Sequence, residues 1–299
     1  MLYDEIDTPA VLVDLDVVER NLQRFQAYCD EQGLKSRPHI KTHKNVGFAK
    51  RQLELGAVGI TCQKLGEAEV MADAGIDDIF LPYNLYGRNA LERAVALARR
   101  VKLSLACDNE VAAAGLSDAF SAAGLRVPVL VECDTGGGRC GVQTPAAAVE
   151  LAARIERSPG LAFGGLMTYP AAGQQQRVQA FVEEALALCD RAGLQVRVVS
   201  SGGTPDLWRA ADVRGVTEHR AGTYIYNDRS LINRGVATES DCALRVLTTV
   251  SSRPTADRAI LDAGSKTLSS DTSGLSGFGH VCEYPAAALY KLNEEHGYL

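Results

Sequence analysis

The sequence predicts a TIM-type (α/β)8 barrel joined to a smaller β-rich domain, and three observations support this fold class. Between residues 37 and 228, short apolar runs alternate eight times with longer Ala-rich segments of helical periodicity. The short runs are almost uniformly apolar, as parallel strands covered on both faces should be. The length of 299 residues suits one barrel with a modest second domain. A doubly wound sheet stays the alternative, because eight strands need not close into a barrel.

The elements follow in chain order. A predicted strand at residues 8–16 and a helix at 17–32 precede the repeat. The eight expected barrel strands are residues 37–41, 59–63, 78–83, 101–108, 127–134, 161–169, 195–200 and 218–224. The expected helices between them are residues 45–55, 65–74, 88–100, 109–123, 145–157, 174–192 and 205–211. Gly75, Gly124 and Gly193 stand where glycine commonly ends a helix.

The segment after the repeat has a different texture. Residues 243–250 and 259–262 are β-like, and a Gly/Ser-rich stretch at 269–279 indicates turns. We therefore expect a barrel at residues 17–235, and a β-rich second domain formed by residues 1–16 and 236–299.

Composition excludes several classes of function. With 31 basic and 37 acidic residues and no long run of Lys or Arg, the chain is not expected to bind nucleic acid. It has no apolar run of roughly 18 residues, and its N-terminus is acidic where a signal peptide is basic, so we expect a cytoplasmic protein without a membrane span. Its eight scattered cysteines, without a CxxC pair, indicate buried free thiols rather than disulfides.

Two small-residue loops indicate a phosphate site. Residues 200–205 read SSGGTP after the seventh strand, and residues 220–224 read RAGTY around the eighth. Small residues let backbone N–H groups face an anion, and Pro205 can open a short helix whose N-terminus favours negative charge. Phosphate often binds after strands seven and eight of such barrels. Either loop alone could be an ordinary turn.

Three side chains at other strand ends are candidates for chemistry. Lys41 ends the first strand, and a lysine facing an apolar barrel is costly unless it is paired or forms a Schiff base with an aldehyde. The alternative is that Lys41 and Lys44 are solvated loop residues. Arg139 follows three glycines that let its guanidinium turn back over the barrel to hold a phenolate or carboxylate oxygen. Tyr169 ends the sixth strand, where its ring either covers a planar ligand or packs in the core.

Five motifs in order carry a resemblance to a known family: RPHIKTHK, DTGGGRCGV, GLMTYP, SSGGTP and RAGTYIYND. Together they resemble the D-threonine aldolase family of the alanine-racemase-like, fold-type III enzymes, which use pyridoxal 5′-phosphate (PLP). The similarity extends over residues 8–296. It implies a PLP-dependent lyase acting on D-β-hydroxy amino acids, with cleavage of D-threonine-like substrates to glycine and an aldehyde. The alternatives are a D-serine or 3-hydroxy-D-aspartate dehydratase, an amino-acid racemase, and a non-catalytic PLP-binding barrel.

The resemblance also assigns roles to residues. Lys41 matches the lysine that forms the Schiff base with PLP, Tyr169 packs on the pyridine ring, and Arg139 lies near the phenolic oxygen. Arg220 aligns with the arginine that faces the pyridine nitrogen in alanine racemases. The implied phosphate cup, together with its flanking loop residue, consists of Ser201, Gly202, Gly203, Thr204, Gly222, Thr223 and Tyr224.

A metal and a catalytic base are harder to place. The family uses a divalent metal (Mn²⁺ or Zn²⁺) as a Lewis acid on the substrate hydroxyl. Its His-x-Cys or His-x-Asp ligand pair follows a point matching residues 294–297, whereas this sequence stops at residue 299, so a truncated second domain is expected. His280 and Cys282 share a strand face and are weak substitutes. His39 and His43 are weak candidates for the base, with hydrogen-bonded loop histidines as the alternative. A homodimer is implied by resemblance alone.

Overall fold

The computed structural model describes residues 3–299, which form two compact units. One unit is Leu22–Ile225, and the other combines residues 3–21 with Tyr226–Leu299. Helix α1 (Leu15–Glu31) contributes residues to both units.

The larger unit is a closed parallel barrel. Its strands are β2 (Lys35–Ser36), β3 (Ile60–Thr61), β4 (Asp78–Leu81), β5 (Lys102–Cys107), β6 (Val127–Cys133), β7 (Leu161–Thr168), β8 (Val198–Ser201) and β9 (Glu218–His219). They are hydrogen-bonded in the order β2-β9-β8-β7-β6-β5-β4-β3. A parallel bridge between His39 and Thr61 joins the two ends of this sheet, and the Thr61 N–H donates to Pro38 O at 2.8 Å. This closure confirms the (α/β)8 prediction and excludes the doubly wound alternative.

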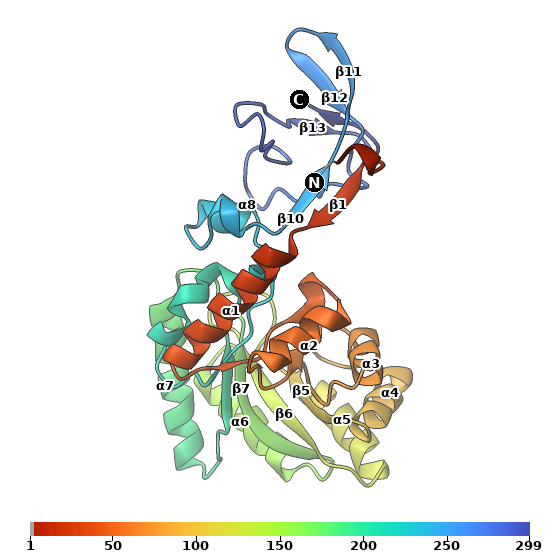
Figure 1. The fold of residues 1–299 in the computed structure, drawn as a ribbon. Coiled ribbons are helices and arrows are strands. Elements are labelled where there is room, and N and C mark those ends of the chain that lie inside the picture. The colour runs from red at the N-terminus through yellow and green to blue at the C-terminus, as the bar shows by residue number, and fades with distance from the viewer. Residues whose placement is uncertain (1–2) are drawn as a thin grey trace. The chain divides into compact units, whose positions relative to one another are not determined.

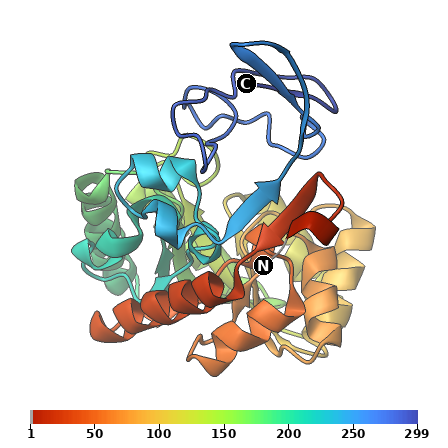
Figure 2. The same cartoon turned by 45° about the horizontal axis from the view of Figure 1, so that its top comes forward.

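The barrel helices form an outer layer around the strands (Figures 1 and 2). They are α2 (Val46–Glu54), α3 (Leu65–Asp73), α4 (Arg88–Ala98), α5 (Glu110–Ala122), α6 (Pro145–Arg157) and α7 (Gln175–Arg191). Side chains of Asn45, Asn109 and Thr144 cap the first turns of α2, α5 and α6 by accepting backbone N–H groups. The predicted helices therefore agree with the structure to within about two residues at each end.

Three predicted elements differ from the structure. The first strand, expected at residues 37–41, lies instead at residues 35–36, and residues 40–42 form a 3-10 helix. The eighth strand likewise ends at residue 219, before a 3-10 helix at Thr223–Ile225. The helix expected at 205–211 is a 3-10 helix at Thr204–Asp212, interrupted by non-helical dihedral angles at Asp206. Short-range turns replace regular structure at the strand ends, because the loops there turn tightly across the barrel mouth.

The barrel has an apolar core on each side of its strands. The interior contains Phe80, Ala106, Leu130 and Met167 from four neighbouring strands, with Val198 packed against them. A larger cluster lies between the strands and helices and includes Ile60, Ile79, Leu105, Val129 and Phe120. Strands buried on both faces read as continuous apolar runs, which is the pattern the sequence shows.

The smaller unit is β-rich, as predicted. Its N-terminal strand β1 (Ala10–Val13) pairs antiparallel with β10 (Leu244–Leu247). A second antiparallel sheet has the order β11-β12-β14-β13, formed by Val250–Thr255, Arg258–Leu261, Gly297–Tyr298 and Lys291–Leu292. Short helices at Tyr3–Glu5, Arg229–Asn233 (α8) and Glu239–Asp241 complete it. The pairing of β1 with β10 brings the N-terminal strand into this unit.

Two expectations from composition can be compared with the fold. No helix within residues 3–299 is both long enough and apolar enough to cross a membrane. All eight cysteines are free, and Cys29, Cys62, Cys107, Cys133 and Cys189 are buried. Cys242 is half-buried, whereas Cys140 and Cys282 are exposed, so the prediction of buried thiols is wrong at the last two positions.

Candidate active site

Lys41 lies just after the point where the barrel closes. Two residues earlier, His39 still belongs to the wall, since its N–H donates to Ala221 O at 2.9 Å. The chain then turns into the 3-10 helix Ile40–Thr42, which contains Lys41. His39 caps this helix, because its Nδ1 accepts the Lys41 N–H at 3.4 Å. Lys41 therefore belongs to a helical turn. The sequence had suggested a strand at this position.

The Lys41 amine lies among other cations. Its Nζ is 6.0 Å from the centroid of the Tyr169 ring, and Arg139 Cζ is 4.8 Å from the same centroid. Partial burial lowers the pKa of Lys41, the positive charges of Arg139 and Arg220 lower it further, and Glu67 opposes them. The side chain nevertheless remains accessible to solvent. An accessible amine with a lowered pKa is a suitable nucleophile toward an aldehyde.

Tyr169 follows β7 and lies between two glycine-rich loops. A Cβ added at Gly203 would come within 2.7 Å of Tyr169 Cε2, so the ring packs directly on that backbone. A Cβ at Gly137 would lie 3.0 Å from Tyr169 O. The side chain is 40% exposed, which is unusual for a packed core tyrosine. One part of the ring is thus supported by protein and another is available to a planar ligand.

The loops after β8 and β9 meet, as predicted. The Gly222 N–H donates to Thr204 Oγ1 at 3.3 Å, and a Cβ at Gly222 would approach His39 O to 2.8 Å. Gly202 has φ +97°, and a Cβ there would collide with the His219 ring. Only glycine fits these positions without displacement, so backbone N–H groups can approach an anion closely. Because the following 3-10 helix is interrupted at Asp206, the loops, and not a regular helix N-terminus, provide these donors.

His219 fixes the first of these loops from within the protein. It is fully buried, and its Nδ1 lies 3.2 Å from Ser201 O. Burial lowers the pKa of His219 to about 4, so the neutral ring donates from Nδ1 to that carbonyl.

The Tyr224 side chain packs in the core. The Tyr224 side chain is buried against Phe25, with ring centroids 4.3 Å apart, and its hydroxyl accepts from Gln52 Nε2 at 2.9 Å. Burial raises the pKa of Tyr224 well above its usual range. The Tyr224 hydroxyl is therefore committed to the core, so Tyr224 can offer only its backbone, within the 3-10 helix Thr223–Ile225, to an anion.

Carboxylates fold the loop that presents Arg139. Asp134 accepts the N–H groups of Gly136 and Gly138 at 2.9 and 3.1 Å, and both glycines have positive φ. Burial raises the pKa of Asp134, but these backbone donors outweigh burial and leave the pKa below its usual value. The neighbouring Asp108 accepts the Gly141 N–H at 2.9 Å. This loop turns Arg139 back toward the Tyr169 ring, as the three glycines predicted.

The two histidines near Lys41 are neutral; His39 is buried and His43 is half-buried. His39 Nε2 lies 3.1 Å from Gln63 Oε1, so both of its ring nitrogens are engaged. Burial lowers the pKa of His39 to about 3, with further contributions from Lys41 and Arg220. His43 Nδ1 accepts the Asn45 N–H at 3.0 Å, and burial lowers the pKa of His43 to about 4. Both fit the alternative of hydrogen-bonded loop residues better than the role of a base.

Arg220 and Glu132 are charged groups inside the barrel mouth. Arg220 is 4% exposed and donates from Nη2 to Thr168 O at 2.7 Å. Glu132, at the same end of β6, is also 4% exposed. Burial raises the pKa of Glu132, while the charges of Arg139 and Arg220 lower it in part. From the sequence, Glu132 was assigned no role, although a carboxylate inside an apolar strand was a usable signal.

The predicted metal residues lie in the smaller unit. His280 Nε2 is 3.7 Å from Glu239 Oε2, and Cys282 is exposed. Across residues 3–299, no three His, Cys, Asp or Glu side chains are grouped as metal ligands.

Two known protein families match separate parts of this chain. Residues 13–230 match the family "Alanine racemase, N-terminal domain", and residues 243–299 match the "Putative serine dehydratase domain". The fold and the lysine at the barrel mouth thus place the protein among the alanine-racemase-like barrels. Within that class, the chain belongs to the D-threonine aldolase family.

Individual relatives support this assignment. The chain is 36% identical to a D-threonine aldolase from Arthrobacter sp., covering 98% of this chain and 79% of that protein. It is also 36% identical to the D-threo-3-hydroxyaspartate dehydratase of Delftia sp. (strain HT23), covering 98% of this chain and 83% of the relative. The crystal structure of D-threonine aldolase from Filomicrobium marinum superposes with a TM-score of 0.91 at 34% identity, covering 100% of this chain and 83% of the other.

Proposed function

We propose that this protein is a PLP-dependent lyase that cleaves D-threonine-like D-β-hydroxy amino acids to glycine and an aldehyde. The observation that carries the proposal is the meeting of three features at one barrel end: an accessible lysine with a lowered pKa, a partly exposed tyrosine ring, and glycine loops that a Cβ would fill. Membership of the D-threonine aldolase family supports the same reaction class.

These residues fit PLP. Lys41 would hold its aldehyde carbon, Tyr169 would lie against the ring, and Arg139 would bind the phenolic oxygen. Arg220 would face the ring nitrogen. The phosphate would be held by the backbone and hydroxyl donors of Ser201, Gly202, Gly203, Thr204, Gly222, Thr223 and Tyr224.

The protein's part in the reaction is binding, orientation and proton handling. PLP, when bound, withdraws electrons from the bonds at the substrate Cα. Lys41 Nζ would hold a proton beside the substrate Cα and return it there, and the lowered pKa of Lys41 favours its neutral, proton-accepting form. His39 cannot take the hydroxyl proton while both of its nitrogens are engaged, so we do not assign the β-hydroxyl proton to His39.

Metal dependence stays a prediction of the resemblance. One solved structure of a D-threo-3-hydroxyaspartate dehydratase variant is described as a metal-free form. The described residues of this chain do not form a group of three metal ligands, so no step is assigned to Mn²⁺ or Zn²⁺. Activity measured with and without chelator and added metal tests the prediction. A cytoplasmic location and a homodimer are likewise predictions from the sequence.

The second candidate function is dehydration. Its support is that the identity to the Delftia dehydratase, 36%, equals the identity to the Arthrobacter aldolase. The products separate the two candidates. Incubation with D-threonine and with D-threo-3-hydroxyaspartate should release glycine and an aldehyde if the aldolase proposal is right. A 2-oxo acid with ammonia would support the dehydratase instead.

Borohydride reduction tests the cofactor assignment directly. Reduction of the PLP-treated protein followed by peptide mapping should place a pyridoxyl mass on the peptide that contains Lys41. A Lys41→Ala variant serves as the control. Absence of the mass from the unsubstituted protein would contradict the proposal.

A further inference from the structure

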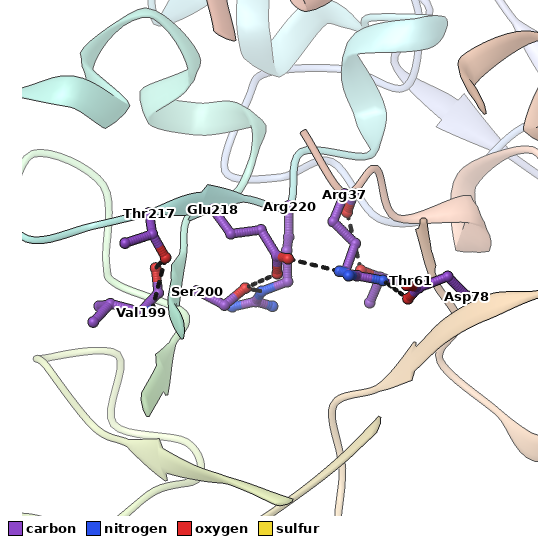
Figure 3. Close-up of polar contacts among 8 residues, drawn as sticks. All are labelled: Arg37, Thr61, Asp78, Val199, Ser200, Thr217, Glu218 and Arg220. Carbon is purple, nitrogen blue, oxygen red and sulfur yellow. Dashed lines mark hydrogen bonds and ion pairs between the residues drawn. The ribbon is translucent and has the colours of Figure 1, made fainter. Parts of the chain in front are cut away.

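A ladder of charged and hydroxyl groups crosses the barrel interior (Figure 3). Arg37 Nη1 donates to Asp78 Oδ1 at 2.5 Å, and Arg37 Nε donates to Glu218 Oε2 at 2.7 Å. Ser200 Oγ lies 2.5 Å from Glu218 Oε1, and Arg220 Nε lies 2.8 Å from Ser200 Oγ. We call these five residues the interior ladder. They come from β4, β8, β9 and the segments that follow β2 and β9.

The direction of both hydrogen bonds of the Ser200 hydroxyl is fixed. The Ser200 hydroxyl has one proton, and a carboxylate can only accept, so Ser200 donates to Glu218 and accepts from Arg220. Arg220 makes its second contact through Nη2 to Thr168 O. Two contacts from different nitrogens of one planar guanidinium define its plane. Within the described residues, Arg220 Nη1 makes no hydrogen bond and remains free for a ligand.

Charges alternate along the ladder, and its end at Ser200, Glu218 and Arg220 is buried, whereas Arg37 and Asp78 are half-buried. Ser200, Glu218 and Arg220 are 0%, 5% and 4% exposed. Burial lowers the pKa of Arg37, but the charges of Glu218 and Asp78 outweigh burial and raise it. Gly59 leaves room for the pair of Arg37 and Asp78, since a Cβ there would lie 2.8 Å from Asp78 Oδ1. Buried ion pairs rarely stabilise a fold more than apolar residues of similar volume would, so stability alone does not account for the ladder.

Arg220, at one end of the interior ladder, lies where the cofactor is proposed to bind. Arg220 Cζ is 5.8 Å from the centroid of the Phe80 ring, which belongs to the apolar interior cluster. The charge of Arg220 acts on the pKa of both Lys41 and His39, so its guanidinium shares their surroundings. The ladder therefore connects the charged barrel interior to the group nearest the proposed cofactor ring.

We propose that Ser200 and Glu218 are positioning residues that hold the plane and charge of Arg220, and through Arg220 set the electronic state of the bound cofactor. The inference rests on the proposed function, in which Arg220 faces the ring nitrogen of PLP. Neither residue touches the substrate or cofactor. Their effect is transmitted by the two hydrogen bonds of the Ser200 hydroxyl.

The test compares ladder variants with a control on the same strand pair. Ser200→Ala removes the link, and Glu218→Gln removes the charge. Thr217→Val removes the bonds of Thr217 Oγ1 to Val199 N (3.0 Å) and Val199 O (3.4 Å), which lie outside the ladder (Figure 3). For each holoenzyme we would record the absorption and visible circular dichroism bands of bound PLP, the PLP dissociation constant, and the pyridoxyl mass on Lys41.

We expect both ladder variants to shift the PLP bands and to raise the PLP dissociation constant by roughly tenfold, whereas Thr217→Val changes neither. In an Arg220→Lys background, Ser200→Ala should add no further shift, because it acts through Arg220. A folded Ser200→Ala protein with unchanged bands would overturn the inference. Should Glu218→Gln not fold, Ser200→Ala still decides the matter, since it leaves every charge in place. Failure to find the pyridoxyl mass on Lys41 in the unsubstituted protein would instead refute the proposed function.

Discussion

Replacing Gly202 by alanine should weaken both the fold and cofactor binding. Gly202 has φ +97°, where a Cβ costs about 1 kcal/mol or more. The new Cβ would also collide with the buried His219 ring, and overpacking of this kind costs about 1–3 kcal/mol. Displacing that ring would break its bond to Ser201 O, worth about 1 kcal/mol. The expected loss is therefore about 3–5 kcal/mol.

Gly124→Ala provides the matched control for this prediction. Gly124 lies in the same unit and also has positive φ, +66°, but nothing lies within 4 Å of a Cβ added there. Its expected cost is about 1 kcal/mol. Thermal unfolding followed by circular dichroism should give a melting temperature roughly 10 °C lower for Gly202→Ala than for Gly124→Ala. Equal melting temperatures would refute the reasoning that His219 fills the space beside Gly202.

Three further predictions follow from single contacts. The rate of PLP capture by the apoprotein should rise with pH as the Lys41 amine loses its proton, with a midpoint below the usual lysine pKa of about 10.5. Stopped-flow absorbance measures this rate, and a midpoint at or above that value would contradict the lowered pKa of Lys41. Asp134→Ala should cost about 2 kcal/mol at neutral pH by freeing the N–H groups of Gly136 and Gly138. Because the pKa of Asp134 is lower in the folded protein, that difference is present above about pH 4 and should shrink as the pH falls through the folded value; denaturant titrations at several pH values check this. Phe80→Ala should cost about 3–5 kcal/mol in the same titrations by leaving a cavity in the barrel interior, and a loss below about 1 kcal/mol would show that the interior repacks.

The helices of the barrel were readable from the sequence because their signals are local. Asn45, Asn109 and Thr144 cap helices, and Gly124 ends one, within a few residues of each apolar stripe. Strand ends were less predictable. Lys35 pairs with Glu218, so the true limits of the first strand depend on residues far away in the chain.

The residues of the candidate site also fall into two groups, those with a local sequence signal and those without one. Lys41 and the glycine loops carry their signal in consecutive residues, so they could be located in advance. Tyr224 could not be assigned, because a tyrosine beside a glycine loop looks the same whether its hydroxyl faces a ligand or Gln52. Ser200 and Glu218 were missed because their partners lie on other strands, which no motif brings together.

The order of synthesis along the chain bears on when the barrel wall beside the His39–Thr61 closure can form. Lys41 lies beside this seam, but the wall around it needs the bond from His39 to Ala221, about 180 residues later in the chain. At about 5–20 residues per second, a ribosome takes on the order of 10–40 s to cover that distance. During this interval Lys41 has been synthesised without Arg220 or the glycine loop that follows β9. The contribution of Arg220 to the lowered pKa of Lys41 is thus acquired only when the last barrel strand has emerged.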